Sequence, residues 1–418
     1  MNNTVALPEP AHSEGASLTP AWLALCSLLL VVCLAEYAQT WIYPPAAAAE
    51  ALVEVSSRLP LRLALWVLAP LAIVVHLLRR GFAGPIAVLM PFAMFWLAGL
   101  ISGLLGFSPA VSMRLVGPWL MMALAATVIG LELPAQRVVR IVLATMLAMM
   151  LGSIAVALLL PERGTMIASG EPVWRGLFIG KNWLGQVAAW CLVSAVCLAP
   201  AASRRLVWST AALSLVCLVG SGSKGALVGA CIALGFGFVV ARLSRRLAPT
   251  LAALTLGVGV ACLGLLAALV LPVLLEALNR DITLTGRTLI WTVYVQDMLH
   301  HPWFGQGPGA YTNPSPVTMP LALQLSRYGP IFTPHNAYLG VFGDAGVFGI
   351  VGFVAAMLWA AVLAPLWRPR VFMRTSAAIA MTIAITGLVE TVHVFGASAG
   401  LFLVLLLRAV ALADEETS

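Results

Sequence analysis

Charged side chains are scarce in this chain: only 9% of its 418 residues are Asp, Glu, Lys or Arg, whereas 61% are hydrophobic. A chain of this length with a mean hydropathy of +1.00 would not dissolve in water. The composition therefore excludes a water-soluble protein. It predicts one integral membrane domain without an appended soluble module.

Familiar metal and redox motifs are also missing. The sequence has no DxD in a loop and no HExxH, which would hold a divalent metal. Its seven cysteines all lie in apolar runs without CxxC spacing, so they are expected to be small core hydrophobes. The first 20 residues contain no Lys or Arg, so a cleavable signal peptide is not expected. No metal site and no cofactor are predicted.

The formal net charge of +7 does not indicate a nucleic-acid partner. The basic residues are scattered through short loops, and neither a basic helix nor an aromatic platform accompanies them. Membrane topology explains these residues better than a polyanion does.

The chain contains many apolar runs of about 20 residues, the length that crosses a bilayer as a helix. We predict an all-α, polytopic transmembrane bundle of about twelve spans. The predicted spans are residues 21–40, 62–78, 84–106, 114–133, 140–160, 182–200, 205–221, 225–242, 251–277, 337–364, 375–394 and 395–412. The predicted division of the chain is a tail at 1–20, nine spans within 21–277, a large loop at 278–336, three spans within 337–412, and a tail at 413–418.

Arginine residues fall in every second connection, as the positive-inside rule requires. These connections contain Arg79 and Arg80, Arg137 and Arg140, Arg204 and Arg205, Arg242, Arg245 and Arg246, and Arg368, Arg370 and Arg374. Both termini are therefore predicted to be cytoplasmic. The longer connections, 41–61, 161–181 and 278–336, are predicted to lie on the opposite, periplasmic side.

The large loop contains two kinds of segment. Residues 286–300 have a helix-like spacing of apolar residues, which predicts an amphipathic helix over the membrane surface. Residues 301–309 are so rich in Gly and Pro that tight turns are expected instead. The loop is the predicted location of the chemistry.

Seven basic residues break the charge rule on the predicted outer side. An arginine guanidinium can bind two phosphate oxygens at once, and lysine acts as a point charge. A bound diphosphate would therefore explain these basic residues. The alternative is contact with lipid headgroups or interfacial snorkelling. Lys224 stands out because it lies between two apolar runs, where a charge is costly. The seven residues are Arg163, Arg175, Lys181, Lys224, Arg280, Arg287 and Arg327.

His335 lies where the large loop meets the next span, so its imidazole is a candidate general base at the membrane interface. The alternative is a histidine that only caps the helix. Glu390 and His393 are three residues apart on one predicted helix face. The sequence leaves two roles open for this pair: the side chains line a cavity, or they form hydrogen bonds between helices.

Three segments together resemble the superfamily of O-antigen ligases and polymerases, which includes bacterial protein O-oligosaccharyltransferases. The first is Gly180-Lys181-Asn182 with Gly185, and the second is Ser223-Lys224-Gly225. The third runs from Arg287 to His335-Asn336 and continues to Gly346 and Gly349. The resemblance covers about residues 175–365.

The resemblance implies a fold like that of C-type glycosyltransferases and a metal-independent, inverting transfer of glycan from undecaprenyl diphosphate. The site would face the periplasm from the inner membrane of a Gram-negative bacterium. In a ligase the acceptor is the lipid A core oligosaccharide, during lipopolysaccharide biosynthesis. His335 would be the general base, with Arg287 and Lys224 on the leaving diphosphate. Further substrate contacts would come from Arg163, Arg175, Lys181, Asn182, Arg280 and Asn336.

Other functions fit the same sequence. An O-antigen polymerase or a protein O-oligosaccharyltransferase would use the same donor site with another acceptor. A lipid-linked glycan transporter would also have about twelve spans, but it should contain two related halves and charges near the bilayer midplane. We find no internal repeat, and the unusual charges gather at one interface, which favours an enzyme.

Overall fold

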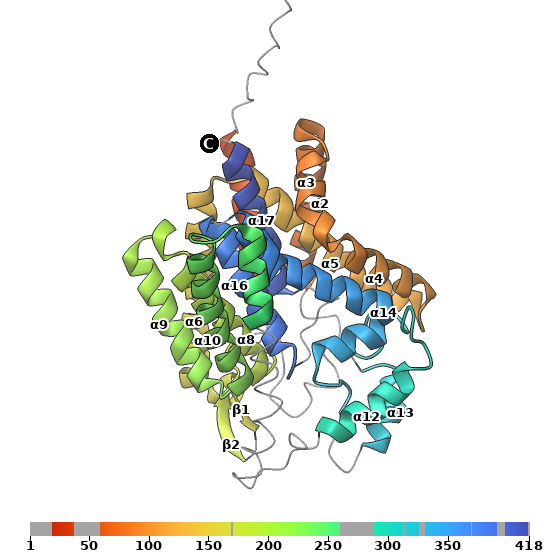
Figure 1. The fold of residues 1–418 in the computed structure, drawn as a ribbon. Helices are drawn as coiled ribbons and strands as arrows, with labels where there is room; N and C mark the ends of the chain where they lie inside the picture. The colour runs from red at the N-terminus through yellow and green to blue at the C-terminus, as the bar shows by residue number, and fades with distance from the viewer. Residues whose placement is uncertain are drawn as a thin grey trace, which may run out of the picture.

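A computed structural model describes residues 19–36, 59–168, 170–259, 287–312, 314–325, 331–368, 370–390 and 398–416. Figure 1 shows a helical bundle with one small hairpin. Its first half contains α1 (Pro20–Ala35), α2 (Leu59–Arg80), α3 (Ala83–Leu89), η2 (Met90–Phe92), α4 (Ala93–Leu105), α5 (Pro109–Glu132), α6 (Ala135–Leu159), α7 (Pro161–Gly164), β1 (Thr165–Ala168) and β2 (Glu171–Trp174). Its second half contains α8 (Lys181–Cys197), η3 (Ala199–Ala201), α9 (Arg204–Gly220), α10 (Lys224–Leu243), a helix over Pro249–Gly259, α12 (Arg287–Met298), α13 (Thr318–Gln324), α14 (Ala337–Leu358), η5 (Trp359–Leu363), α15 (Ala364–Trp367), α16 (Val371–Thr386) and α17 (Ala399–Glu416).

Most of the predicted spans coincide with helices where the structure describes them. The predicted span 375–394 does not: α16 ends at Thr386, and residues 387–390 form turns and a bend. The prediction that Glu390 lies on a helix face is therefore wrong. Within the described residues, five helices are long and apolar enough to cross a membrane. These are Ala83–Leu105, Pro109–Glu132, Ala135–Leu159, Lys224–Leu243 and Ala337–Trp367. The helical class is therefore confirmed, while the count of twelve spans and the boundaries of the predicted loop stay predictions.

The hairpin β1–β2 is a departure from the predicted all-α fold. Its strands pair antiparallel, with Thr165 opposite Trp174 and Ala168 opposite Glu171. Gly170 has a φ of 82°, a left-handed conformation that glycine adopts without steric cost at the tip of such a turn. The sequence prediction treated residues 161–181 only as a connection, because strands of four residues give too short a pattern to recognise.

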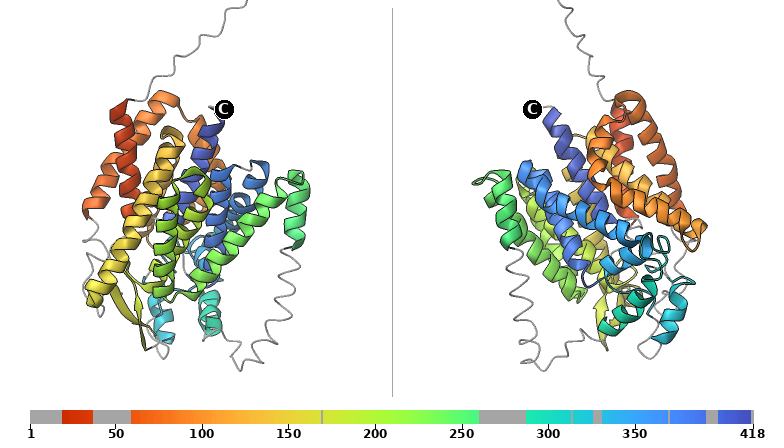
Figure 2. Two further views of the ribbon diagram at one scale, coloured as in Figure 1. Left: turned by 90° about the vertical axis from the view of Figure 1, so that its left-hand side faces the viewer. Right: turned by 45° about the vertical axis from the view of Figure 1, so that its right-hand side comes forward.

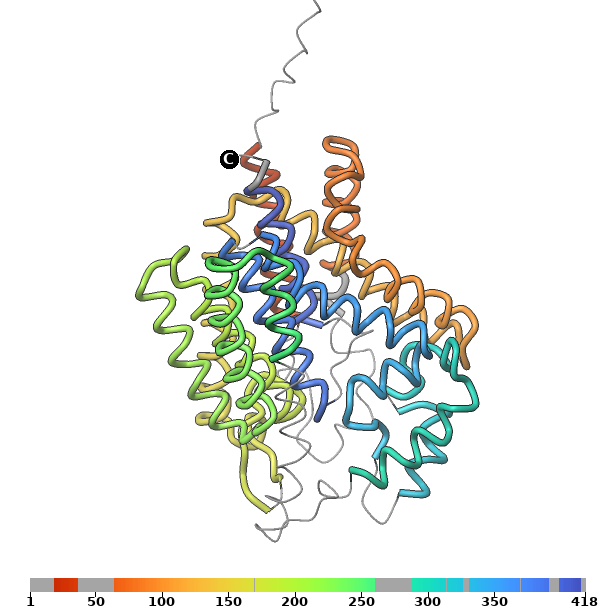
Figure 3. Tube along the Cα trace, in the orientation of Figure 1, coloured from red at the N-terminus to blue at the C-terminus, as the bar shows by residue number. Residues whose placement is uncertain are grey.

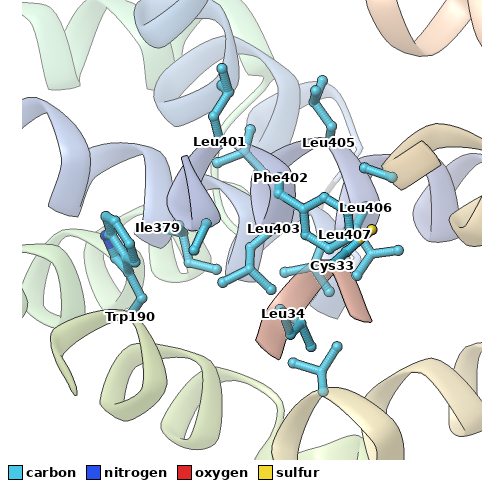
Figure 4. Close-up of a cluster of buried hydrophobic side chains, with 14 of the residues drawn as sticks. Cys33, Leu34, Trp190, Ile379, Leu401, Phe402, Leu403, Leu405, Leu406 and Leu407 are labelled. Carbon is cyan, nitrogen blue, oxygen red and sulfur yellow. The ribbon is translucent and has the colours of Figure 1, made fainter. Parts of the chain in front are cut away.

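The core lies around α17, which packs against α5 and α16. Residues Leu401 to Leu407 are all buried, and Figure 4 shows several of them between neighbouring helices. A helix that is apolar all round belongs at the centre of a bundle. Gly130 of α5 allows the closest approach, since a Cβ there would lie 2.6 Å from that of Ala409. Small residues at such crossings let helix backbones pack tightly.

One end of the bundle gathers the arginine-rich connections. Arg80, at the end of α2, lies 3.3 Å from Glu132 at the end of α5, and His76 lies 2.7 Å from the same carboxylate. Arg370, just before α16, pairs with Asp414 near the end of α17. Figure 2 shows that the hairpin and the two short helices α12 and α13 lie at the opposite end from the C-terminus. The arginine-rich connections of α2 and α16 are thus separated in space from the hairpin and from α12 and α13.

Helix α14 is bent sharply at Gly346, whose φ of 65° is not helical. The turns of residues 301–309 pack into this bend: the N–H of Gln306 donates to Gly343 and that of Val347 donates to Pro302. A Cβ on Gly346 would lie 2.2 Å from the backbone of Trp303. The path of the chain through the bend can be followed in Figure 3. The predicted turns are confirmed, and they are part of the fold of α14.

Asp344 holds these turns in place. Its carboxylate is fully buried and accepts hydrogen bonds from the backbone N–H of Gly309 at 3.0 Å, the N–H of Tyr311 at 2.8 Å and the hydroxyl of Thr312 at 2.7 Å. A buried carboxylate needs such donors to offset the loss of water. The isolated acid in the sequence is thus an anchor for the loop.

Candidate active site

Arg287 begins α12 and reaches across to the segment that follows α16. Its Nη1 donates to the carbonyl of Val389, and its Nη2 lies 3.4 Å from Oε1 of Glu390. The side chains of Arg287 and Glu390 are 25% and 15% exposed, so the pair is partly shielded from solvent. The guanidinium is held at both nitrogens and retains access to a ligand.

His335 faces the other oxygen of the same carboxylate. Its Nδ1 lies 3.9 Å from Oε2 of Glu390, and its side chain is 42% exposed. Glu390 therefore lies between an arginine and a histidine from two other segments. This separation is longer than a hydrogen bond. A carboxylate beside an imidazole can serve general-base catalysis, and the predicted role of His335 as the base stays a prediction.

The backbone at His335 is strained. Its φ of 48° is left-handed, and no other non-glycine residue in the described part of the chain has a positive φ. This conformation costs roughly 1 to 2 kcal/mol for a residue with a Cβ. The preceding carbonyl, that of Pro334, accepts a 2.9 Å hydrogen bond from the indole of Trp291 in α12. Strain of this kind persists where the surroundings fix it and is concentrated at functional sites.

Asn336 fixes the start of α14. Its Oδ1 accepts from the N–H of Leu339 at 3.0 Å, as an N-cap, and its Nδ2 donates to the carbonyl of Leu388 at 3.1 Å. The N–H of Ala337 donates to Gly387 at 2.7 Å. Both ends of the Asn336 amide are thus used within the protein. Its role here is to position His335, and its predicted contact with substrate stays a prediction.

Lys224 lies beside this cluster at the start of α10. Its side chain is exposed, and a Cβ on the adjacent Gly225 would lie 2.8 Å from the side chain of Val389. The neighbouring Ser223 packs still more closely on Gly185 of α8, where an added Cβ would lie 2.4 Å from the Cβ of Ser223. The small residues around Lys224 therefore allow α8, α10 and the segment of Glu390 to meet.

The remaining basic residues form a second group around the hairpin. Arg175 is only 3% exposed, and its Nε donates to the carbonyl of Arg163 at 2.6 Å. Burial lowers the pKa of the Arg175 guanidinium from its ordinary value. The side chain of Arg163 is exposed, whereas Lys181 and Asn182 are half-buried in the first turn of α8.

The hairpin packs on the turn before Lys224, which links the two groups. A Cβ on Gly220 would lie 2.4 Å from the ring of Trp174, and one on Gly222 would lie 3.4 Å from Val173. Arg175 follows these hairpin residues directly in the chain. Positive side chains from four segments thus gather at one end of the bundle.

A hollow of about 540 Å³ lies at the other end of α12. Phe107 and Ser108, between α4 and α5, line one side, and Asp297, Gln306 and Val317 line the other. Asp297 lies ten residues after Arg287, which corresponds to about 15 Å along a helix. An aromatic ring, a hydroxyl, an amide and a carboxylate around one hollow provide groups that suit a polyhydroxylated ligand.

The sequence prediction named most of the central cluster but gave Glu390 no specific role. The signal that could have identified it was an ionisable residue near the outer end of a span, facing the same interface as His335. The predicted substrate residue Arg280, the basic residue Arg327 and the histidine His393 lie outside the described residues. The structure brings together Arg287, His335 and Asn336, places Lys224 next to them, and keeps Arg175 and Arg163 apart from them.

The five apolar helices that are long enough to cross a membrane are those of a helical membrane protein, and Arg287, Glu390 and His335 form one cluster of titratable residues in it. Residues 209–354 match the family model described as O-antigen ligase, so this segment is similar to that family. The predicted resemblance is therefore confirmed. A comparison with curated proteins found no match.

The matched segment contains Lys224, Arg287, His335 and Asn336. Members of this family are glycosyltransferase-like ligases and polymerases, and lipid-linked polysaccharides are the substrates that the family implies. Glu390 and the hairpin residues lie outside the match.

Proposed function

We propose that this protein is an O-antigen ligase, which transfers a glycan from undecaprenyl diphosphate to the lipid A core oligosaccharide. The observation that carries the proposal is the cluster of Arg287, Glu390 and His335, in which one carboxylate lies between a cation and a strained histidine. The family match covers the first and last of these residues.

In the proposed reaction, an acceptor hydroxyl oxygen attacks the anomeric carbon of the donor glycan. The bond from that carbon to the diphosphate oxygen breaks as the new glycosidic bond forms, so the configuration inverts. The hydroxyl proton passes to Nε2 of His335, and the bonding electrons leave with the diphosphate. Glu390 stabilises the resulting imidazolium through Nδ1, since an opposite charge nearby favours the protonated form.

The charge that develops on the leaving diphosphate needs fixed cations. Arg287 and Lys224 are the residues we assign to it, because Arg287 donates to the carbonyl of Val389 and Gly225, which follows Lys224, packs against the Val389 side chain. Arg175, Lys181, Asn182, Arg163 and Arg280 are the proposed outer contacts to the donor. Preorganised positive groups of this kind stabilise the transition state without a metal, so a chelator should leave the transfer rate unchanged; strong inhibition would contradict this chemistry.

The proposed location is the inner membrane of a Gram-negative bacterium, with the site facing the periplasm and both termini in the cytoplasm. The support is the separation of the arginine-rich connections from the site end of the bundle. The 540 Å³ hollow beside Asp297 would hold sugar residues at a distance from the reacting carbon.

The test is a deletion strain complemented with wild type or with His335→Ala, followed by analysis of lipopolysaccharide and of lipid-linked glycan. A ligase predicts bare lipid A core and long chains stranded on the carrier, rescued by wild type alone. Lipopolysaccharide with single repeats would instead indicate a polymerase. An unchanged profile would overturn the proposal in favour of a protein acceptor or of transport. Membrane content of both proteins, measured by immunoblot, is the control.

A further inference from the structure

A second cavity lies at the arginine-rich end of the bundle, away from the candidate active site. It has a volume of about 200 Å³, and its lining includes Arg408 of α17, Trp359 of η5, and Trp367 and Arg368 at the end of α15. The other described residues that line it are apolar. The cavity therefore combines two cationic side chains with two indole rings.

Arg408 has a structural reason to be buried. Its Nη2 donates to the carbonyl of Ala87 at 2.8 Å, and its Nε donates to that of Val88 at 2.9 Å. Pro91 has no N–H, so the carbonyl four residues earlier, that of Ala87, has lost its helical donor. The arginine replaces that donor where α3 gives way to η2. This accounts for the hydrogen bonds of Arg408, but not for its charge.

The charge of Arg408 has no acidic partner among the described residues. The side chain is 7% exposed, and its guanidinium carbon lies 3.8 Å from the ring centre of Trp359. A cation over an indole face is attracted to it, but this does not neutralise it. A buried cation inside a membrane protein is costly without an anion, and the neighbouring Arg368 makes the local field more positive.

The backbone also changes form at this cavity. Residues Trp359–Leu363 form a single π-helical turn that continues α14. Such turns are uncommon and frequently accompany functional sites. Here the turn begins at Trp359, the residue that stacks on Arg408.

The cavity lies at the end of the apolar helix Ala337–Trp367, which is long enough to cross a membrane. Trp367 is 55% exposed, as is typical of the aromatic belt at a membrane interface, and Arg368 follows it directly. Arg408 is eight residues before the end of α17 at Glu416, or about 12 Å along the helix. The cavity is smaller than the roughly 300 Å³ at which sites for drug-sized ligands begin, so it suits a headgroup whose acyl chains remain outside.

We propose that this cavity binds the phosphate of an anionic phospholipid from the leaflet at the arginine-rich end of the bundle. Arg408 offers its free N–H groups to the phosphate from within, Arg368 approaches it from the interface, and the indole rings of Trp359 and Trp367 enclose the glycerol. Basic pockets between transmembrane helices are known to suit anionic headgroups. Free inorganic phosphate has the same chemistry, so the test separates the two sources.

The test measures the thermal unfolding of the full chain, purified in a neutral detergent and depleted of lipid. Phosphatidylglycerol should raise the midpoint temperature by several degrees, whereas phosphatidylethanolamine and millimolar inorganic phosphate should not. In Arg408→Gln the rise should be lost. Arg140→Gln is the matched control, since it removes an exposed arginine from the start of α6 and should respond as wild type does.

A rise of equal size in Arg408→Gln, or with phosphatidylethanolamine or phosphate alone, would overturn the proposal. Should Arg408→Gln fail to fold, Arg368→Gln provides the second variant, with native mass spectrometry as the readout. It should retain less than half of the phosphatidylglycerol that wild type retains at the same lipid concentration. Equal retention by wild type and Arg368→Gln would contradict the assignment.

Discussion

Replacing Glu390 with Gln tests the central cluster most directly, because it removes one charge with little change in shape. The carboxylate lies 3.9 Å from Nδ1 of His335. With the histidine 42% exposed and Glu390 15% exposed, an effective dielectric constant of about 40 to 80 is appropriate. Coulomb's law then gives roughly 1 to 2 kcal/mol for the stabilisation of the imidazolium.

That loss corresponds to a turnover about 6 to 35 times slower in Glu390→Gln. The KM for the lipid-linked donor should not rise, because Arg287 loses a carboxylate that competes with the diphosphate for its guanidinium. The assay follows glycan transfer from purified polyprenyl-diphosphate donor to acceptor in detergent, at several donor concentrations. A lower kcat with an unchanged or lower KM is the expected result.

The matched control is Glu171→Gln, the same charge change at an exposed position on β2, which should retain wild-type turnover. An unchanged kcat in Glu390→Gln would refute the electrostatic role of this carboxylate. A loss as complete as in His335→Ala, in a protein that unfolds at the wild-type temperature, would also refute it. Such a loss would mean that Glu390 itself takes part in bond making.

Three further predictions concern the site and its supports. Arg287→Lys should raise the KM for the donor about tenfold, because one ammonium group cannot replace two guanidinium nitrogens that bind different oxygens of the diphosphate. An unchanged KM would contradict this prediction. Gly346→Ala should lower the free energy of unfolding by at least about 2 kcal/mol, because Gly346 has a left-handed φ and the backbone of Trp303 lies against it. The control is Gly235→Ala, which has open space around it and should be neutral or stabilising in the same thermal melt. Burial and the nearby Asp297 raise the pKa of Tyr311, so the folded state holds the phenol proton more tightly than the unfolded state does. The stability of the fold should therefore decrease as the pH rises above about 10. A midpoint of thermal unfolding that does not change between about pH 9 and 11 would contradict this prediction.

The positions of the helices could be predicted because apolar runs of membrane-spanning length are long and leave strong signals. The turns of 301–309 were also predictable, since Gly305, Gly307 and Gly309 all adopt positive φ. The hairpin β1–β2 was not predictable, because each strand has only four residues. The number of spans stays a prediction, since hydropathy gives lengths and not the position of a bilayer.

In the candidate site, the sequence predicted the candidate residues but not the contacts between them. His335 and Arg287 could be named from their residue types and from the family resemblance. The part of Glu390 could not, because its contacts reach over 50 and over 100 positions along the chain. Gly346 and its neighbour Asp344 show the converse. Gly346 belongs to the recognised pattern, yet in the structure it forms a bend in α14, and Asp344 holds the loop that packs into that bend.

The end of α16 has one consequence for how this site can change. The carbonyls of Gly387, Leu388 and Val389 accept hydrogen bonds from Ala337, Asn336 and Arg287 in turn. The start of α14, its cap Asn336 and Arg287 are therefore attached to one short peptide segment that follows α16. A shift of that segment would move these three attachment points together. Substitutions at residues 387–389 are therefore expected to displace the start of α14 and Arg287 together.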